Sequence, residues 1–212
     1  MKRDPNSIQR FTLRERIIHW LVGILFVYLM LTGLALFSPH LYWLAAVLGG
    51  GTTIARWHPI AGVMFFAALA GMFLQWRRDM RLEATDREWM KQMGQYIRNE
   101  DEGLPEVGRF NPGQKQLFWL QAINGFLLLI SGIPLWFPHS FSQELRLAGI
   151  LVHEISALAA IGGLIVHIYM GTAVVGGSLA AMIGGRVTQA WARTHHPRWY
   201  RERQSRETGE PR

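Results

Sequence analysis

The sequence predicts an all-α integral membrane protein, a four-helix bundle with both termini in the cytoplasm. Half of the 212 residues are hydrophobic. They are concentrated in four blocks of roughly 20 residues or more, each long enough to cross about 30 Å of hydrocarbon as a helix. The predicted spans are residues 17–37, 57–76, 117–137 and 147–175. None has the polar stripe of a soluble amphipathic helix, and too little sequence remains to bury four such helices in a soluble core.

The distribution of positive charge predicts the orientation of the bundle. The chain carries a formal net charge of +7, and its lysines and arginines crowd the N-terminal arm, the loop 77–115 and the tail 178–212. The other two connections carry one each, Arg56 and Arg146. Positive residues mark the cytoplasmic side of a membrane protein, so both termini and the long loop are expected inside. The positive net charge is therefore explained by membrane topology, and no nucleic-acid partner is expected.

Two features of the chain limit the chemistry that it can carry. The first apolar block follows a charged stretch of about 16 residues and has no clear small-residue cleavage site, so it is interpreted as a span and not as a signal peptide.

The chain has no cysteine, which excludes disulfides, iron–sulfur ligation and covalent attachment of a c-type haem within it. A haem would have to be held by axial ligands and non-covalent contacts, as b-type haems are.

Four histidines lie inside the predicted spans, where an ionisable side chain costs free energy and usually marks a functional site. With the orientation above, His19 and His167 lie near the inner face, and His58 and His153 near the outer face. His153 and His167 stand on one helix, about 21 Å apart along its axis and within about 40° of the same side. The depths therefore pair His58 with His153 and His19 with His167. Two imidazoles from different helices at each of two depths are the geometry of two bis-histidine haems.

Small residues accompany these histidines, as close approach of a flat macrocycle requires. Four of them lie on the histidine face of the last span: Ser156, Ala157, Ala160 and Gly163. Gly33 on the first span is expected at the level of the outer pair, and Gly132 on the third span is a second candidate for that role. The segments Leu31-Thr-Gly-Leu and Ile130-Ser-Gly-Ile echo each other, which we interpret as matched packing and not as an internal repeat.

Other interpretations of the histidines fit less well. A lone histidine within a span is often only a helix–helix hydrogen-bonding group, but that does not account for four whose depths pair. A zinc or copper ion would need its ligands clustered at a single depth. His40 and His139 fall at the outer boundary as interfacial residues, and His195 and His196 in the tail have no depth-matched partner. None of these four is expected to bind metal.

Five sets of motifs along the chain match a known family. They are Arg14-Glu-Arg-Ile-Ile-His-Trp, Trp57-His-Pro with Gly62-Val-Met-Phe, Gly108-Arg-Phe-Asn-Pro-Gly-Gln-Lys, Val152-His with Val166-His-Ile-Tyr-Met, and Trp191-Ala-Arg-Thr-His-His-Pro-Arg-Trp-Tyr-Arg-Glu. With these motifs the chain resembles, over essentially its whole length, the cytochrome b (gamma) subunit of membrane-bound respiratory formate dehydrogenases. The resemblance implies a single membrane cytochrome b domain over residues 1–212, and the same two ligand pairs for an outer and an inner haem b.

The resemblance also implies a quinone pocket at the cytoplasmic face beside the inner haem. Its residues would be Asn111, Gly113 and Gln114, with His167 close by. Without the family, Asn-Pro-Gly-Gln is only a favourable turn before the third span. The family ends that span with Trp-Arg-Pro, whereas this chain has Trp136-Phe-Pro. A contact between that arginine and an outer haem propionate is therefore missing here, or is made by Arg146 or a partner chain.

By the same resemblance, the chain is a multi-pass electron-transfer subunit of the bacterial inner (cytoplasmic) membrane and does not act on formate alone. A catalytic subunit with molybdenum or tungsten would oxidise formate, and an iron–sulfur subunit would deliver the electrons at the outer face. Two haems b would carry them to menaquinone or ubiquinone at the cytoplasmic face. Membrane lipid and a higher oligomer of the heterotrimer are further expected partners. The alternatives are the cytochrome b of another quinone-linked complex, of the hydrogenase or thiosulfate reductase type, and a haem-free membrane anchor or transporter.

Overall fold

The computed structural model describes residues 6–98, 100 and 102–208. Residues 1–5 of the basic arm and residues 209–212 of the expected cytoplasmic tail lie outside the described residues. The helices and strands within them are β1 (Ser7–Gln9), α1 (Leu13–Phe37), α2 (Trp43–Val47), α3 (Gly51–Trp76), α4 (Ala84–Lys91), α5 (Met93–Ile97), α6 (Pro112–Trp136), α7 (Gln143–Tyr169), α8 (Ser178–Gly184), β2 (Arg186–Thr188), α9 (Gln189–His195) and α10 (Pro197–Thr208). A π-helical turn, Met170–Val174, continues α7, and short 3-10 turns cover Pro39–Leu41 and Pro138–Ser140.

Four long helices occupy the four predicted spans. Helices α1, α3, α6 and α7, the last with its π-helical continuation, are each long and apolar enough to cross a membrane. The all-α membrane-bundle prediction is therefore confirmed, while the location of the termini stays a prediction. Each helix begins four to six residues before its predicted apolar block, because polar residues of the first turn are helical too.

Capping bonds set two of these early starts. The backbone N–H of Thr12 donates to Oε2 of Glu15 at 2.7 Å, and the N–H of Glu15 donates to Oγ1 of Thr12 at 3.3 Å. This reciprocal pair is a capping box at the start of α1. Asn111 and Gln114 exchange the same two bonds at the start of α6, at 2.9 and 3.0 Å. Pro112 then takes the first helical position, where its missing N–H costs nothing.

The chain divides into two compact units. The span unit contains Ile17–Gln75 and Leu120–Leu164, and the terminal unit contains Met1–Arg16, Trp76–Trp119 and Ile165–Arg212. Each long helix contributes most of its length to the span unit and an end to the terminal unit. The interpretation of the whole chain as one domain stays a prediction.

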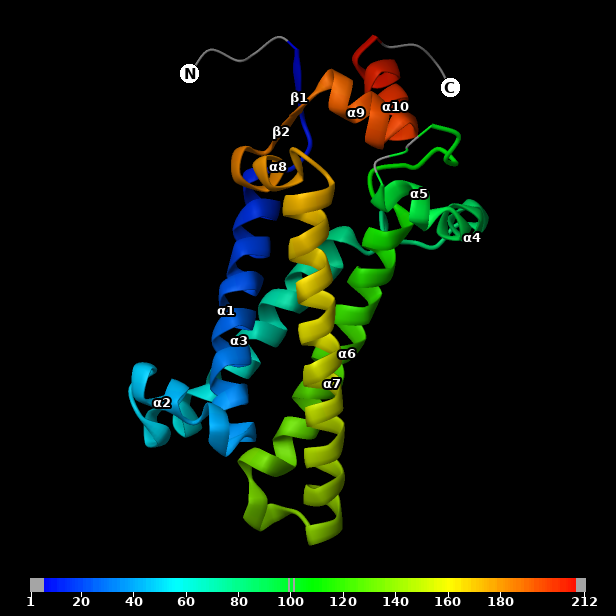
Figure 1. Cartoon of the computed structure of the whole chain (residues 1–212). Helices are drawn as coiled ribbons and strands as arrows, with labels where there is room; N and C mark the ends of the chain where they lie inside the picture. Colours follow the sequence, from blue (N-terminus) through cyan, green and yellow to red (C-terminus); the bar gives the residue numbers. More distant parts are fainter. Residues whose placement is uncertain (1–5, 99, 101, 209–212) are drawn as a thin grey trace. The chain divides into compact units, whose positions relative to one another are not determined.

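In the span unit, parts of the four long helices run lengthwise past one another (Figure 1). Phe26 on α1 meets Phe65 on α3 edge to face, with ring centroids 5.7 Å apart. Between α6 and α7, Nε2 of Gln121 donates to the carbonyl of Ala160 at 2.9 Å. Gly149 on α7 admits the ring of Pro134 on α6: a Cβ at Gly149 would lie only 2.9 Å from Cγ of Pro134. Close packing of this kind at small residues is typical of helices in membranes.

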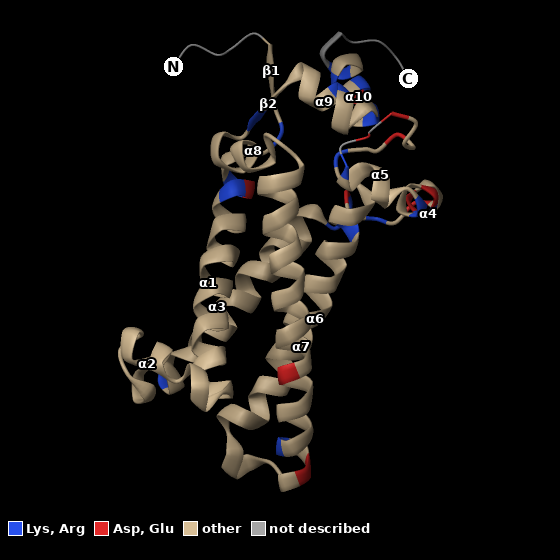
Figure 2. Ribbon diagram, viewed as in Figure 1, with Lys and Arg blue, Asp and Glu red and all other residues tan. Residues whose placement is uncertain are grey.

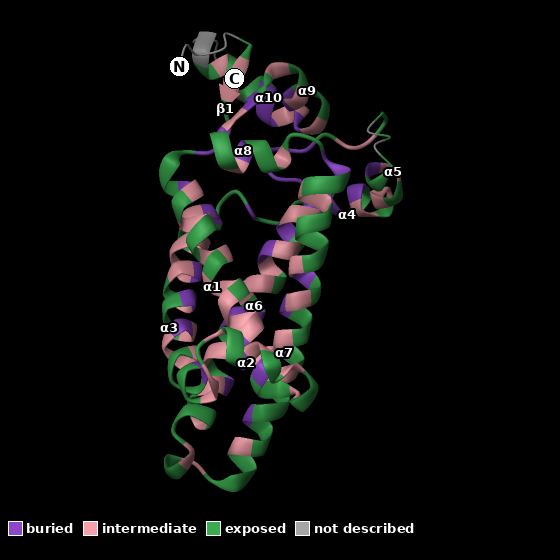
Figure 3. Ribbon diagram, turned by 60° about the vertical axis from the view of Figure 1, so that its left-hand side comes forward, coloured by how far each residue is buried: buried purple, intermediate pink, exposed green. Residues whose placement is uncertain are grey.

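The outer surfaces of the long helices are apolar. Ile24, Leu74 and Ile123 are 66%, 66% and 56% exposed, and much of the helical surface in Figure 3 is exposed or only partly buried. The whole span unit contains four charged residues, Arg56, Glu144, Arg146 and Glu154, and Figure 2 shows long uncharged stretches in its helices. A surface so apolar over such a length is stable in lipid and not in water.

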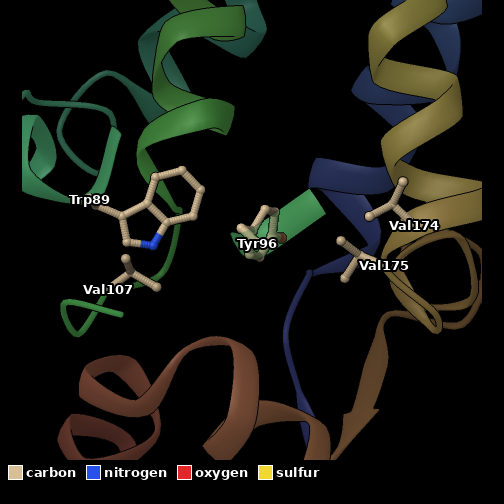
Figure 4. Close-up of a cluster of buried hydrophobic side chains, with 5 residues drawn as sticks. All are labelled: Trp89, Tyr96, Val107, Val174 and Val175. Carbon is tan, nitrogen blue, oxygen red and sulfur yellow. The ribbon is translucent and has the colours of Figure 1, made fainter. Parts of the chain in front are cut away.

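The terminal unit holds a feature that the sequence did not predict, a pair of short antiparallel strands. Ile8 in β1 stands opposite Val187 in β2, and three residues pair on each side. The unit also contains an apolar cluster of Trp89, Tyr96, Val107, Val174 and Val175 (Figure 4). In this cluster α4 and α5 pack on the chain that follows α7. The long loop is thereby a folded part of the terminal unit.

Candidate functional site

Two of the four predicted ligands face each other in the span unit. The ring centroids of His58 on α3 and His153 on α7 lie 6.3 Å apart, and the ring planes are inclined by 61°. Both side chains are half-buried. The structure therefore brings together the two histidines that helix depth assigns to the outer level.

Each of these histidines is held by a hydroxyl from a neighbouring helix. Nδ1 of His58 lies 2.7 Å from Oγ1 of Thr32 on α1, and Nδ1 of His153 lies 3.0 Å from Oγ of Ser131 on α6. The next residue along each helix is a glycine that borders the same ring. A Cβ at Gly33 would lie 3.4 Å from Cε1 of His58. A Cβ at Gly132 would lie equally far, 3.4 Å, from Cε1 of His153.

The distance between the two rings fits a metal bound by both. A metal–imidazole bond is about 2.0–2.1 Å long, and the ring centre lies about 1 Å beyond the nitrogen, so two such ligands place their centroids about 6 Å apart. Within the described residues, no three His, Cys, Asp or Glu side chains gather as a metal-ion cage. A haem needs only two protein ligands, one on each side of its plane, and the residues present fit that group.

The inward face of α7 is a stripe of small residues. The buried residues of this helix are Gly149, Ser156, Ala160 and Gly163. Together with His153 and His167 they recur every three or four residues, which places all six on one face of the helix. Ala157 is half-buried. The histidine face that the sequence predicted for this span is thus the buried face of the helix in its span-unit part. Glu154, next to His153, is half-buried.

The second predicted pair is divided between the two units. His19 on α1 belongs to the span unit, where its ring meets that of Trp20 edge to face with centroids 5.7 Å apart. His167, in the last turn of α7, belongs to the terminal unit and has an exposed side chain. Their meeting at an inner level stays a prediction.

The residues assigned to quinone by resemblance form the start of α6. Asn111 is 3% exposed; its Oδ1 and backbone N–H make the cap with Gln114, and its Nδ2 donates to the Tyr96 hydroxyl at 2.8 Å. A Cβ at Gly113 would lie 3.4 Å from Oδ1 of Asn111 and 3.8 Å from Cε of Met93. The favourable turn expected from Asn-Pro-Gly-Gln is therefore a helix cap, and the quinone role of these residues stays a prediction.

The sequence missed the role of one tail histidine. His196 is 1% exposed; its Nδ1 lies 2.8 Å from the Gly108 carbonyl and its Nε2 lies 2.9 Å from Nη2 of Arg10. Arginine only donates, so Nε2 accepts and Nδ1–H donates to the carbonyl. Burial first, and then the charge of Arg10, lowers the pKa of His196 well below its ordinary value. His40 and His139 are exposed, and their place at the outer boundary stays a prediction.

The same contacts bury the cation of Arg10. Its guanidinium lies 4.8 Å from the ring centre of Trp191 and 5.3 Å from that of Trp199. Burial, and next the charge of Arg109, lowers the pKa of Arg10 to about 9, so the group is a cation at neutral pH. The sequence does hold a signal for this buried cluster: aromatic residues surround the two tail histidines, and side chains this large are usually buried.

Four membrane-spanning helices and two facing imidazoles define the class of membrane cytochromes b. The chain belongs to the prokaryotic cytochrome b561 family, whose model matches residues 10–185. This family implies a haem b and a membrane location in a prokaryote.

Named relatives are similar over nearly the whole chain. A cytochrome b556(fdo) subunit of formate dehydrogenase from Escherichia coli (strain K12) is 37% identical over 95% of this chain and 95% of its own length. The cytochrome b556 subunit of Haemophilus influenzae formate dehydrogenase is 38% identical over 94% of this chain and 84% of its own length. The nitrate-inducible formate dehydrogenase of E. coli K12 has a cytochrome b556(Fdn) subunit that is 32% identical over 89% of this chain and 88% of its own length. The resemblance drawn from the motifs is confirmed.

Proposed function

We propose that the chain is the di-haem b subunit of a formate dehydrogenase. In this role it carries electrons from an iron–sulfur subunit at the outer face to quinone at the cytoplasmic face. The relatives named above are cytochrome b556 subunits of formate dehydrogenases, and they cover the chain almost completely. The observation that carries the haem part of the proposal is the facing pair His58 and His153, with ring centroids 6.3 Å apart.

The outer haem would be held by α3 and α7. His58 and His153 would hold it through imidazole nitrogens, and Gly33 and Gly132, which border the two rings, would leave space beside them. Haem b, when bound, supplies one-electron chemistry at its iron. The helices contribute fixed ligands and a site from which lipid-facing apolar residues exclude water.

The inner haem would be held by His19 and His167. In its support, α7 is one unbroken helix from Gln143 to Tyr169, so the 14-residue spacing keeps His167 on the stripe that also carries His153. The rise of about 1.5 Å per residue places the two histidines about 21 Å apart along that helix. One helix can therefore present a ligand at each of two levels, while α3 and α1 each supply the second ligand at one level.

The quinone site is proposed at the start of α6. The cap uses Oε1 of Gln114 and both side-chain groups of Asn111, so a quinone oxygen would meet the Gln114 amide nitrogen or the backbone near Gly113. His167 would lie close to this site. The quinone bound there would be menaquinone or ubiquinone.

The proposed partners are a molybdenum or tungsten subunit that oxidises formate and an iron–sulfur subunit, assembled as a heterotrimer that can form a higher oligomer. The proposed location is the bacterial inner membrane with both chain ends in the cytoplasm, as the positive residues favour. Electrons moving inward then build the membrane potential, at about 2.3 kcal/mol per charge per 100 mV.

Reduction by different donors tests the proposal. In membranes that contain the complex, formate is expected to reduce b-type haem, and haem quantitation is expected to give two haems per chain. A large formate-oxidising subunit is expected to purify with the chain. Reduction of the haem by hydrogen, or oxidation of the reduced haem by thiosulfate, would instead assign the chain to another quinone-linked complex. A colourless purified chain would support a haem-free anchor or transporter and overturn the proposal.

A further inference from the structure

The two hydroxyls that touch the facing histidines form a matched pair. Thr32 on α1 stands against His58 on α3, and Ser131 on α6 stands against His153 on α7. In each case the hydroxyl residue is followed by the glycine that borders the same ring. Both hydroxyl residues are buried, at 0% and 6% exposure. Two Thr/Ser-Gly dipeptides on different helices therefore provide the same support to the two rings.

The direction of these hydrogen bonds follows from the single proton of a hydroxyl. Oγ1 of Thr32 donates that proton to the carbonyl of Tyr28 at 2.8 Å. Oγ of Ser131 donates its proton to the carbonyl of Leu127 at 2.6 Å. Each oxygen can then only accept from the imidazole, so Nδ1 carries a proton on both rings. The remaining ring nitrogen, Nε2, has its lone pair free in both cases.

We propose that Thr32 and Ser131 are positioning residues for the outer haem. Each hydroxyl fixes its histidine in the Nδ1–H tautomer and orients the ring so that Nε2 binds the iron. This inference rests on the proposed function, since it needs a haem between His58 and His153. A partner that accepts from the distal N–H of a ligand histidine also raises the basicity of that ligand. The hydroxyls therefore stabilise the ferric state and lower the reduction potential of this haem.

The test replaces each hydroxyl by a group of similar size. The variants are Thr32→Val and Ser131→Ala, with Thr32→Ser and Ser131→Thr as conservative variants that keep an acceptor. The full chain is expressed with its complex, and the membranes are titrated while the b-type absorption bands of the two haems are followed. Electron paramagnetic resonance of the ferric haems reports the ligand field independently.

Thr32→Val and Ser131→Ala are each expected to shift the potential of the same one of the two haems toward positive values and to change its ferric resonance. Weaker retention of that haem, on the order of 10- to 100-fold, is expected with them. Thr32→Ser and Ser131→Thr are expected to restore the wild-type values. Thr172→Val is the matched control: its hydroxyl donates to the Ile168 carbonyl at 2.6 Å, as that of Thr32 does to Tyr28, and neither potential is expected to move.

Distinct results separate this inference from the proposed function. If both haems are present in the wild type and keep their potentials and resonances in Thr32→Val and Ser131→Ala, the positioning role is wrong and the di-haem function stands. If Thr32→Ser loses the haem as completely as Thr32→Val, packing and not the hydrogen bond is responsible, and the inference is overturned as well. If the wild-type chain holds no haem, the proposed function itself fails.

Discussion

His58 on α3 and His153 on α7 face each other with ring centroids 6.3 Å apart, although 94 residues separate them in the chain. Neither helix alone defines this site. The two rings meet because α3 and α7 begin at the same end of the span unit, and each histidine lies within the first three turns of its helix. In the proposed function each of these histidines would be one of the two protein ligands of one haem iron.

The first prediction concerns the ligand pairs. His153→Ala and His58→Ala are each expected to remove one b-type haem per chain and to leave the same residual spectrum. His19→Ala and His167→Ala are expected to leave the complementary spectrum. Reduced-minus-oxidised spectra with haem quantitation measure this, and His139→Ala, at an exposed histidine, is the control that keeps both haems. A residual spectrum that His153→Ala shares with His19→Ala would show that the depth pairing is wrong.

The second prediction concerns a buried ion pair in the terminal unit. Nζ of Lys115 lies 3.0 and 2.8 Å from the two carboxylate oxygens of Asp86, and the two side chains are only 3% and 12% exposed. Asp86→Asn leaves the ammonium buried, and among the described residues Glu83 is then the one carboxylate paired with it, at 3.7 Å. Breaking a buried pair costs about 3–5 kcal/mol, and we expect about 3 kcal/mol because Glu83 remains.

Thermal unfolding of the detergent-solubilised complex measures this loss as a fall in Tm of roughly 10 °C, at about 2–4 °C per kcal/mol. Glu88→Gln on the same helix is the matched control. It removes the Lys91–Glu88 pair, whose side chains are 65% and 59% exposed, and such pairs contribute about 0–1 kcal/mol. Equal effects of the two substitutions would show that burial of Lys115 does not determine the cost.

The spans could be predicted from the sequence because they depend only on the length and composition of apolar blocks. The outer histidine pair could be predicted because it depends only on depth along these helices. The partners of the histidines could not. The echo between the Thr32-Gly33 and Ser131-Gly132 dipeptides was interpreted as matched packing, and only the structure shows that each hydroxyl meets an imidazole. The burial of His196 depends on Arg10, 186 residues away. Pairing of β1 with β2 is equally non-local, and three-residue strands carry too little pattern to be recognised.

The third prediction concerns the pH dependence of stability at His196. Its folded-state pKa is lowered by burial, Arg10 and His195, against the opposing hydrogen bond to Gly108. An unfolded histidine has a pKa of about 6.5, so below that pH the unfolded chain binds a proton that the folded chain does not. The free energy of unfolding should therefore fall as the pH falls below about 6.5, by up to about 1.4 kcal/mol per pH unit. Above that range this contribution to the slope disappears.

Stability measured from pH 5 to pH 8, a range set by the ordinary histidine pKa of about 6.5, tests this dependence. His196→Gln is expected to flatten the slope, because the amide can accept from Arg10 and donate to the Gly108 carbonyl without titrating. His139→Gln, at an exposed position, should leave the slope unchanged. A slope that survives in His196→Gln would assign the dependence to other groups.

The last prediction concerns orientation in the membrane, on which the names of the outer and inner haems depend. Because the chain has no cysteine, single cysteines can be introduced and labelled. Ser140 follows α6, Thr85 lies in the first turn of α4, and both are exposed. In intact spheroplasts a membrane-impermeant maleimide is expected to label Ser140→Cys, whereas Thr85→Cys should react only after lysis, since positive loops stay in the cytoplasm. The reverse pattern would invert both haem levels and the direction of charge movement, and labelling of both variants would contradict a bundle of four spans.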